Sequence, residues 1–367
     1  ASDYTKWGSS QTGDIVTAPG LWSLDNYGNK LIATIFDGAT FEWDSDGSTS
    51  TRATIIANAP TAALQTLVST PDRHLVFFGT ETTIGTTATQ DDMYIRWSDQ
   101  ESIDATTSYA PSATNTAGTQ RLADGTRIVG AIRGRDAIYI WTDTSLFIMR
   151  FVGAPFVFSF QQVGTNCGLI GKHAAVEVDG SAYWMSENGF FRYTGKLESL
   201  ACLVEDYVYD DINTIPKNHI YAGLNNLFGE VTWFYTSSSG TSNNRSVTYN
   251  YMDSTPERPV WTTSSLARSA WSDSHIFGKP HGTEYDSSAT SDSTVGNTDG
   301  VTTYFEHETG QDQIKAATAS AIAANIQSGD FDISLGQGGA DLRGDGEYMM
   351  KIRRVLPDFL QQTGDAT

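Results

Sequence analysis

The sequence predicts an all-β protein, and three observations support this fold class. Charged residues make up only 18% of the 367 residues, whereas Gly, Ser and Thr are abundant. Aromatic residues, which favour strands, reach 11%. Short apolar runs recur along the chain, and each ends at Gly, Asp or Asn, which favour turns. Short strands separated by such turns are typical of antiparallel meanders.

The apolar runs form successive predicted hairpins. Residues 31–36 end at Asp37-Gly38 and are followed by residues 40–43, which is the pattern of a β-hairpin. The later runs are 74–78 with 93–97, 127–132 with 137–141 and 145–150, 174–178 with 181–185 and 190–193, and 229–235 with 246–251. The recurring unit is therefore a meander of three or four strands.

Tryptophans mark the period of this unit. Seven of the nine occur at positions 22, 43, 97, 141, 184, 233 and 261. After the first, their intervals are mostly about 40 to 55 residues, close to the repeat of about 40–45 residues of a propeller blade. We therefore predict a β-propeller of about six blades with long inserted loops. A large β-sandwich is the alternative, because its strands also come in hairpins.

The chain reads as a single propeller domain over residues 1–367, since no Pro-rich linker divides it. Residues 286–300 are poor in apolar side chains and are predicted to form an inserted loop. Residues 312–367 are expected to be irregular. Within them, the Ala-rich residues 313–327 favour a helix by composition, but their flanks resemble strands, so both remain open.

The net charge of −20 disfavours several partner classes. Gripping a nucleic-acid backbone needs clustered Lys and Arg, which this chain lacks. An acidic surface remains compatible with DNA that slides past without adhering. No polybasic run favours anionic lipids, and no apolar run reaches the ~18 residues of a membrane span. We expect no membrane anchor and no signal peptide.

Catalytic and metal-binding patterns are scarce. There is no GxSxG motif, and the six His residues are scattered. His173 is expected to cap a turn or bond between blades, and His275 and His281 would bind a metal only if the chain folded them together. Cys167 and Cys202 are expected to be reduced core thiols, with one disulfide as the alternative.

Carboxylates are plentiful, and paired carboxylates on a propeller raise the question of a glycosidase. Residues 45–49 resemble the Asp-box turn of sialidases, but only one copy occurs and its Trp is missing. The arginine pairs 133/135 and 353/354 are better explained by salt bridges. Residues 341–347 are acidic and Gly-rich, which suits calcium but fits a hairpin turn better. Phosphate-binding motifs are absent. We therefore expect no enzyme, no metal and no cofactor.

Residues 163–191 resemble a stretch of the tail proteins of short-tailed bacteriophages. These are the tail nozzle, or tail tubular protein B, and the related packaged-DNA stabilisation hub proteins. Similar pieces occur at 95–99, 141–146, 303–310 and 353–359. The likeness extends loosely from about residue 70 to 360 and is strongest at 125–200 and 300–359. The order of the pieces along one chain carries the resemblance.

This resemblance implies a structural virion protein in a phage tail. Six copies would form a ring below the tail adaptor, retain packaged double-stranded DNA and let it pass during ejection. Tail fibre or appendage proteins would be further partners, although 367 residues leave little room for separate docking domains. A carbohydrate-binding or glycan-hydrolysing propeller that recognises a receptor is the alternative. A third is an adhesion propeller with calcium-bound loops.

The candidate functional residues lie in predicted loops. Residues 82–92 and 237–244 are expected to approach neighbouring subunits or the channel. The candidate interface or channel residues in and next to these loops are Glu81, Asp91, Asp92, Asn243 and Asn244. The Gly-rich residues 164–171 are expected to fix the entry of the chain into a blade.

Overall fold

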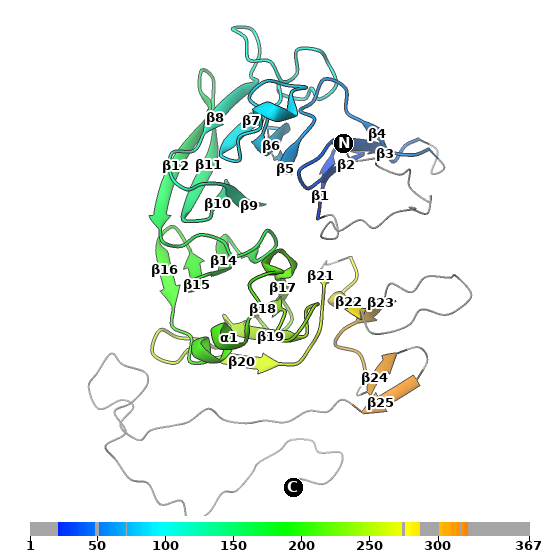
Figure 1. The fold of residues 1–367 in the computed structure, drawn as a ribbon, viewed down its shortest axis with the longest axis vertical. Helices are drawn as coiled ribbons and strands as arrows, with labels where there is room; N and C mark the ends of the chain where they lie inside the picture. The colour runs from blue at the N-terminus through cyan, green and yellow to red at the C-terminus, as the bar shows by residue number, and fades with distance from the viewer. Residues whose placement is uncertain are drawn as a thin grey trace, which may run out of the picture.

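The computed structural model describes residues 21–47, 51–70, 72–273, 276–286, 301–310, 312–315 and 318–321. These residues form five four-stranded sheets and one three-stranded sheet, each an antiparallel meander in chain order. The sheets are arranged as the six blades of a β-propeller (Figure 1). The predicted all-β propeller of about six blades is confirmed, and the sandwich alternative is wrong.

The strand bounds follow the predicted runs closely. Blade 1 contains β1 (Trp22–Tyr27), β2 (Lys30–Ile35), β3 (Thr40–Asp44) and β4 (Thr54–Ile55). Blade 2 contains β5 (Ala63–Ser69), β6 (His74–Thr80), β7 (Tyr94–Trp97) and β8 (Gly118–Arg121). Blade 3 contains β9 (Ile128–Arg133), β10 (Ile138–Thr142), β11 (Ser145–Gly153) and β12 (Val157–Thr165).

Blade 4 contains β13 (Ala175–Val178), β14 (Ser181–Ser186), β15 (Gly189–Tyr193) and β16 (Leu197–Leu200). Blade 5 contains β17 (Tyr221–Asn225), β18 (Glu230–Tyr235), β19 (Arg245–Asn250) and β20 (Trp261–Ser264). Blade 6 contains β21 (Ala270–Ser272), β22 (His281–Asp286) and β23 (Val301–Glu306). Short helical turns lie at η1 (Thr87–Thr89), α1 (Glu205–Asp211) and η2 (Lys217–His219).

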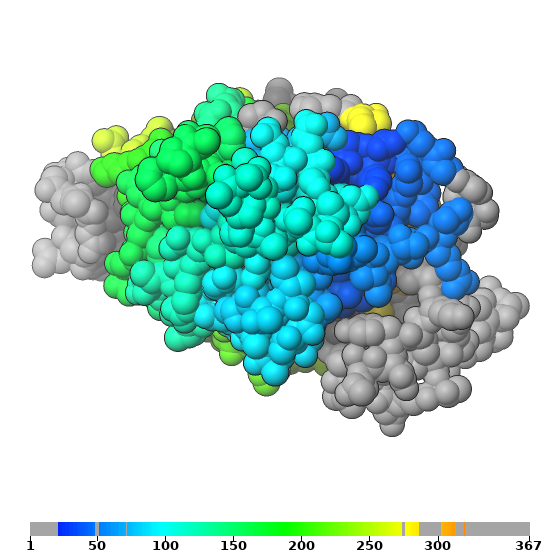
Figure 2. Space-filling model, turned by 90° about the horizontal axis from the view of Figure 1, so that it is seen from above, coloured from blue at the N-terminus to red at the C-terminus, as the bar shows by residue number. Residues whose placement is uncertain are grey.

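The first strands of successive blades lie next to one another, from β1 through β5, β9, β13 and β17 to β21. Figure 2 shows blades 1, 2 and 3 side by side in blue, cyan and green when the propeller is seen from its edge. The buried apolar side chains form clusters between blades 1 and 2, between blades 2 and 3, and across blades 3 to 5. The core therefore lies between the sheets, as burial of both faces of a blade requires.

The tryptophan period has a structural cause. Trp141, Trp184 and Trp233 occupy the second strands of blades 3, 4 and 5, and all three are fully buried. The indole N–H of Trp184 donates to the carbonyl of Cys167 over 2.8 Å, and that of Trp233 donates to Ala174 over 2.9 Å. Both acceptors precede the first strand of blade 4, so these indoles tie neighbouring blades together.

Two elements differ from the sequence-based expectation. Residues 312–321 contain the antiparallel strands β24 (Asp312–Lys315) and β25 (Thr318–Ala321), so the helix considered for 313–327 is wrong there. The expectation of an irregular segment from residue 312 is wrong for the same strands. Helix α1 was not predicted, because seven residues with few apolar side chains give little periodicity. Most of the predicted loop 286–300 and residues 341–347 lie outside the described part.

The meander gives the propeller two distinct faces. One face carries the connections between blades and the turns between second and third strands, and we call it the connection face. The other carries the turns between first and second strands and between third and fourth strands, and we call it the turn face. Cys167 and Cys202 are buried and unpaired, as predicted. No helix among the described residues is long and apolar enough to cross a bilayer.

Candidate functional site

The three segments that the sequence singled out reach the same face of the propeller. Residues 82–92 join the second and third strands of blade 2, and residues 237–244 do so in blade 5. Residues 164–171 connect blade 3 to blade 4. All three therefore lie on the connection face, although blades 2 and 5 are three positions apart.

Glu81 anchors the first of these loops from within the fold. Its side chain is fully buried, and its carboxylate accepts hydrogen bonds from the Thr61 hydroxyl and from the Gly85 N–H, the latter over 2.7 Å. The Arg96 guanidinium donates to the carbonyl of Thr82 over 2.8 Å. The sequence predicts that Glu81 contacts a neighbouring subunit or the channel, but its carboxylate instead holds the base of the loop.

Asp91 and Asp92 end the loop at 82–92, just before β7 of blade 2. The Asp91 carboxylate accepts from the Arg121 Nε over 2.7 Å and from the Met93 N–H over 2.9 Å. Burial opposes ionisation of Asp91, but these two hydrogen bonds lower its pKa below the usual range. Burial and the nearby Asp37 raise the pKa of Asp92. Only the carbonyl of Asp92 has a defined role, accepting from the first residue of β9 over 2.9 Å.

The two asparagines of the second loop also serve the fold. Asn243 is buried, and its amide donates to the carbonyls of His219 over 2.7 Å and Arg268 over 2.9 Å. It thereby joins the connections on either side of blade 5, and this burial differs from the expected contact with a neighbour. Asn244 closes the loop on itself through both atoms of its amide, which bond Ser237 over 2.8 and 2.9 Å.

The Gly-rich connection fixes the entry into blade 4. A Cβ at Gly168 would overlap the carbonyl of Asp143, and one at Gly171 would overlap the carbonyl of Lys217. Only glycine allows such close backbone approach. The carbonyl of His173, two residues after Gly171, accepts a hydrogen bond from the Ala222 N–H over 2.7 Å. This backbone bond joins blade 4 to blade 5, and the turn-capping or bonding role expected of the imidazole stays a prediction.

Lys172 reaches across the propeller from this connection. Its ammonium is buried, donates to the carbonyl of Leu64 over 3.1 Å and lies 5.5 Å from the centre of the Phe36 ring. Burial lowers the pKa of Lys172 to about 8. Burial and this lysine lower the pKa of His173 to about 4. The lysine joins blade 4 to blades 1 and 2.

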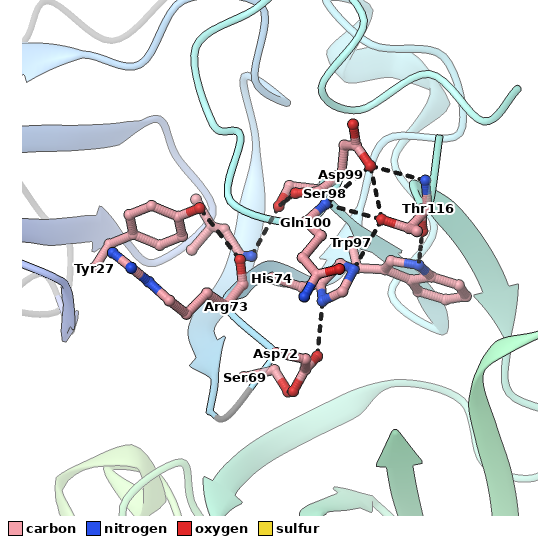
Figure 3. Close-up of polar contacts among 11 residues, drawn as sticks. Tyr27, Ser69, Asp72, Arg73, His74, Trp97, Ser98, Asp99, Gln100 and Thr116 are labelled. Atoms are coloured by element: carbon pink, nitrogen blue, oxygen red, sulfur yellow. Dashed lines mark hydrogen bonds and ion pairs between the residues drawn. The ribbon is translucent and has the colours of Figure 1, made fainter. Parts of the chain in front are cut away.

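A polar network joins the turn between β5 and β6 of blade 2 to residues 98–117, the long loop between β7 and β8 (Figure 3). Ser69 donates to one oxygen of Asp72 over 2.8 Å, and the other oxygen lies 2.7 Å from Nδ1 of His74. Nε2 of His74 lies 3.1 Å from the Thr116 hydroxyl. A carboxylate, an imidazole and a hydroxyl in this order match the arrangement of a hydrolase triad.

The far end of this network shows how the hydroxyl is used. The Thr116 hydroxyl donates to Asp99 over 2.7 Å and accepts from the Gln100 N–H over 2.9 Å. The indole of Trp97 donates to the Thr116 carbonyl over 2.9 Å. Burial opposes ionisation of Asp99, but hydrogen bonds from Thr116 and Gln100 and the nearby His74 lower its pKa.

The network is closed to a substrate. His74 is fully buried, with the Phe158 ring 5.2 Å and the Phe151 ring 6.0 Å from its own. The adjoining cavity, lined in part by Ser69 and Asp72, holds about 30 Å³, roughly the volume of one water molecule. The arrangement therefore clamps residues 98–117 onto the turn at 70–73.

Replacing His74 by Ala should lower the free energy of unfolding by about 2–4 kcal/mol, because it leaves a cavity and an unpaired buried carboxylate. Urea unfolding, followed by tryptophan fluorescence, measures this change. Limited proteolysis should show faster cleavage within residues 98–117. Thr114→Ala, on an exposed residue of the same loop, is the matched control. Unchanged stability and unchanged cleavage would contradict the clamp.

A second cavity in the described part of the chain is also too small for a typical ligand. A cavity of about 150 Å³ beside Trp43 is lined by Lys30, Glu42 and Arg52, smaller than the ~300 Å³ at which ligand pockets begin. No group of three or more His, Cys, Asp or Glu residues is placed to hold a metal ion in that part.

Sequence reasoning missed a set of exposed apolar side chains on the turn face. Phe156 is 78% exposed, and Met252 is 70% exposed. Leu227 and Phe228 are also exposed, in the turn between β17 and β18. An apolar pair between Asn225-Asn226 and Gly229, where a polar turn is expected, was the available signal.

The described residues thus define a six-bladed propeller whose histidine and carboxylate networks hold blades and loops together. No protein-family model matches the chain, and no curated protein is significantly similar to it. Among solved structures, Sqt1 from Saccharomyces cerevisiae matches 72% of this chain and 69% of its own, at 10% identity and a TM-score of 0.45.

The WD40 domain of SCAP from fission yeast matches 81% of this chain and 78% of its own, at 10% identity and a TM-score of 0.41. BamB from Moraxella catarrhalis matches 79% and 83%, at 12% identity and a TM-score of 0.38. At these values the likeness concerns the general propeller fold and says nothing of function.

Proposed function

We propose that this protein is a structural subunit of a phage tail nozzle, which forms a six-membered ring through which DNA leaves the virion. One observation carries the proposal: polar groups that resemble catalytic sites are sealed inside the fold, whereas large apolar side chains are exposed. The resemblance of residues 163–191 and the pieces around them to tail nozzle proteins supplies the particular assembly.

The exposed side chains are unusual for an acidic chain. Ile215 is 92% exposed and Ile276 is 89% exposed, in addition to Phe156 and Met252. Exposed apolar side chains that form a contiguous patch, as Phe228 and Met252 do, mark contacts with other protein chains. Aromatic residues and Met are enriched in such interfaces. A propeller that assembles with copies of itself accounts for this surface.

The charge of the chain suits a DNA conduit. At a net charge of −20, a subunit repels the phosphate backbone. Strong binding to DNA would require clusters of Lys and Arg that release counterions. A channel formed by acidic subunits would retain DNA by its dimensions and would not hold the strand during ejection.

A carbohydrate-binding propeller is the second candidate, on a different observation. In blade 6 the rings of His281 and Tyr304 stack with centroids 5.3 Å apart, and the Phe277 ring meets His281 edge to face at 4.8 Å. Tyr304 is 62% exposed. An exposed aromatic stack beside polar groups is a feature that such a site would use.

The mass of the assembly separates the two candidates. The nozzle proposal predicts a species of six times the mass of one chain by mass photometry, without added ligand. A glycan array should then show no retention. A monomer at every concentration, retained on the array and released by Tyr304→Ala, would overturn the nozzle proposal in favour of the second candidate.

A further inference from the structure

Two exposed apolar sites occupy the turn face, on blades 3 and 5. The first is the hairpin tip, formed by Val152 and Phe156 between β11 and β12. These two strands have nine residues each, more than any other strand described. The second is the blade 5 patch, formed by Leu227, Phe228 and Met252, which are 65%, 50% and 70% exposed.

The hairpin tip projects beyond the core of its blade. Residues 145–149 of β11 are buried, whereas Arg150 and the two residues after it are exposed. Val152 is 54% exposed, less than Phe156. Arg150 and Arg135, both exposed, give this end of blade 3 cationic side chains, and the exposed Asp136 directly follows Arg135.

The blade 5 patch is a continuous surface made by two turns. Met252 packs on the backbone of Gly229, and the Tyr251 N–H donates to the Gly229 carbonyl over 2.8 Å. The Asn250 amide donates to the carbonyl of Phe228 over 3.3 Å. The turn at 226–229 and residues 250–252 therefore lie side by side.

Carboxylates border this patch. Glu230 begins β18 beside it, and Asp253 directly follows Met252. Burial raises the pKa of Glu230, and the charges of Glu308 and Asp253 raise it further. These three carboxylates are thus close enough to repel one another. A cation from another chain would relieve that repulsion.

We propose that the hairpin tip of one copy docks on the blade 5 patch of the next copy in the ring, with Arg150 facing the carboxylates around Asp253. This contact rests on the proposed function, because it names the surfaces by which that ring is built. Apolar side chains meet apolar side chains, and the cationic border of one site meets the acidic border of the other. Such complementarity fixes register and orientation.

The positions of the two sites suit a closed ring of six. The hairpin tip lies on the β11–β12 turn of blade 3 and the patch on the β17–β18 and β19–β20 turns of blade 5, and two blades are separated by about 120° around a six-bladed propeller. The two neighbours of a subunit in a six-membered ring also lie about 120° apart, and a head-to-tail contact closes only when the rotation matches. A second copy therefore fits better than an unrelated partner.

The side of the propeller that lies between the hairpin tip and the blade 5 patch would face the axis of the assembly. It contains blade 4 and helix α1, which lies between β16 and β20 in Figure 1. Four of the seven residues of α1 are carboxylates: Glu205, Asp206, Asp210 and Asp211. An acidic wall on this side agrees with DNA passing without adhering.

A cysteine pair tests the contact directly in the full-length chain. Phe156→Cys combined with Met252→Cys should give, after mild oxidation, a ladder of disulfide-linked species ending at six copies. Phe156→Cys combined with Ile215→Cys is the control, since Ile215 lies on the connection between blades 4 and 5. That pair should give no ladder.

Charge reversal gives a readout that misfolding cannot imitate. Arg150→Glu should weaken assembly by about tenfold or more, as expected for a like-charge contact. Adding Asp253→Arg to the same chain should restore it. A ring of six that forms no Phe156–Met252 cross-link and ignores Arg150→Glu would overturn this contact but not the nozzle. A chain that never assembles would overturn both.

Discussion

Trp184→Ala is expected to lower the free energy of unfolding by about 3–5 kcal/mol, the range found for large aromatic truncations in cores. Trp184 is fully buried and lies 5.3 Å from the ring of Trp141 in blade 3. The substitution removes these contacts and also leaves the carbonyl of Cys167 without its indole donor. Blades 3 and 4 should therefore lose their main connection.

Urea unfolding monitored by far-ultraviolet circular dichroism measures this loss. Trp22→Ala is the matched control, because Trp22 is 37% exposed on the first strand of blade 1. The control should cost clearly less than Trp184→Ala, since more than a third of the Trp22 surface is already exposed to solvent. Equal losses in the two variants would contradict the assignment of Trp184 to a core between blades.

The stability of the wild type should rise between pH 8 and 9.5 relative to that of Lys172→Met. The folded protein lowers the pKa of Lys172 from 10.5 to about 8 because the ammonium is buried. Between these values the unfolded chain binds more protons than the folded one, so the free energy of unfolding increases with pH. At about 1.4 kcal/mol per pKa unit, the full rise is about 3 kcal/mol.

Buried thiols and tyrosines oppose this trend. Burial raises the pKa of Cys167 to about 11 and that of Cys202 to about 12, so ionisation of both thiols in the unfolded chain lowers stability from about pH 9. Burial raises the pKa of Tyr27 to about 12, so stability falls once tyrosines ionise in the unfolded chain. The comparison is therefore made between pH 8 and 9.5, as the difference between wild type and Lys172→Met. Lys196→Met, on an exposed lysine, is the control. If the free energy of unfolding changes with pH in the same way in all three proteins, the pKa of Lys172 is not lowered by burial.

The fold was largely predictable because its signal is local and repeated. The hairpin around Asp37-Gly38 and the meander at 174–193 appear within one or two residues of the predicted runs. Three of the indoles, those of Trp141, Trp184 and Trp233, occupy the second strand of consecutive blades, which explains their spacing. Helix α1 and the hairpin of β24 and β25 escaped prediction because each is too short to give a distinct period.

The candidate site was harder to predict, since burial depends on the packing of distant segments. Glu81 and Asn243 read as polar loop residues, but each is buried by contacts with segments up to 25 residues away. Sequence alone does not distinguish such an anchor from a contact residue. The blade 5 patch joins two turns that are separated along the chain, so only the folded arrangement shows its continuity.

The central claim is that six copies assemble by head-to-tail contact around a channel. Cryo-electron microscopy of the assembled full-length chain tests it most directly. We expect six propellers with six-fold symmetry, an open channel on the side of blade 4, and the β11–β12 hairpin of each copy on blade 5 of the next. A monomeric propeller, or an assembly of another symmetry without a channel, would contradict the account.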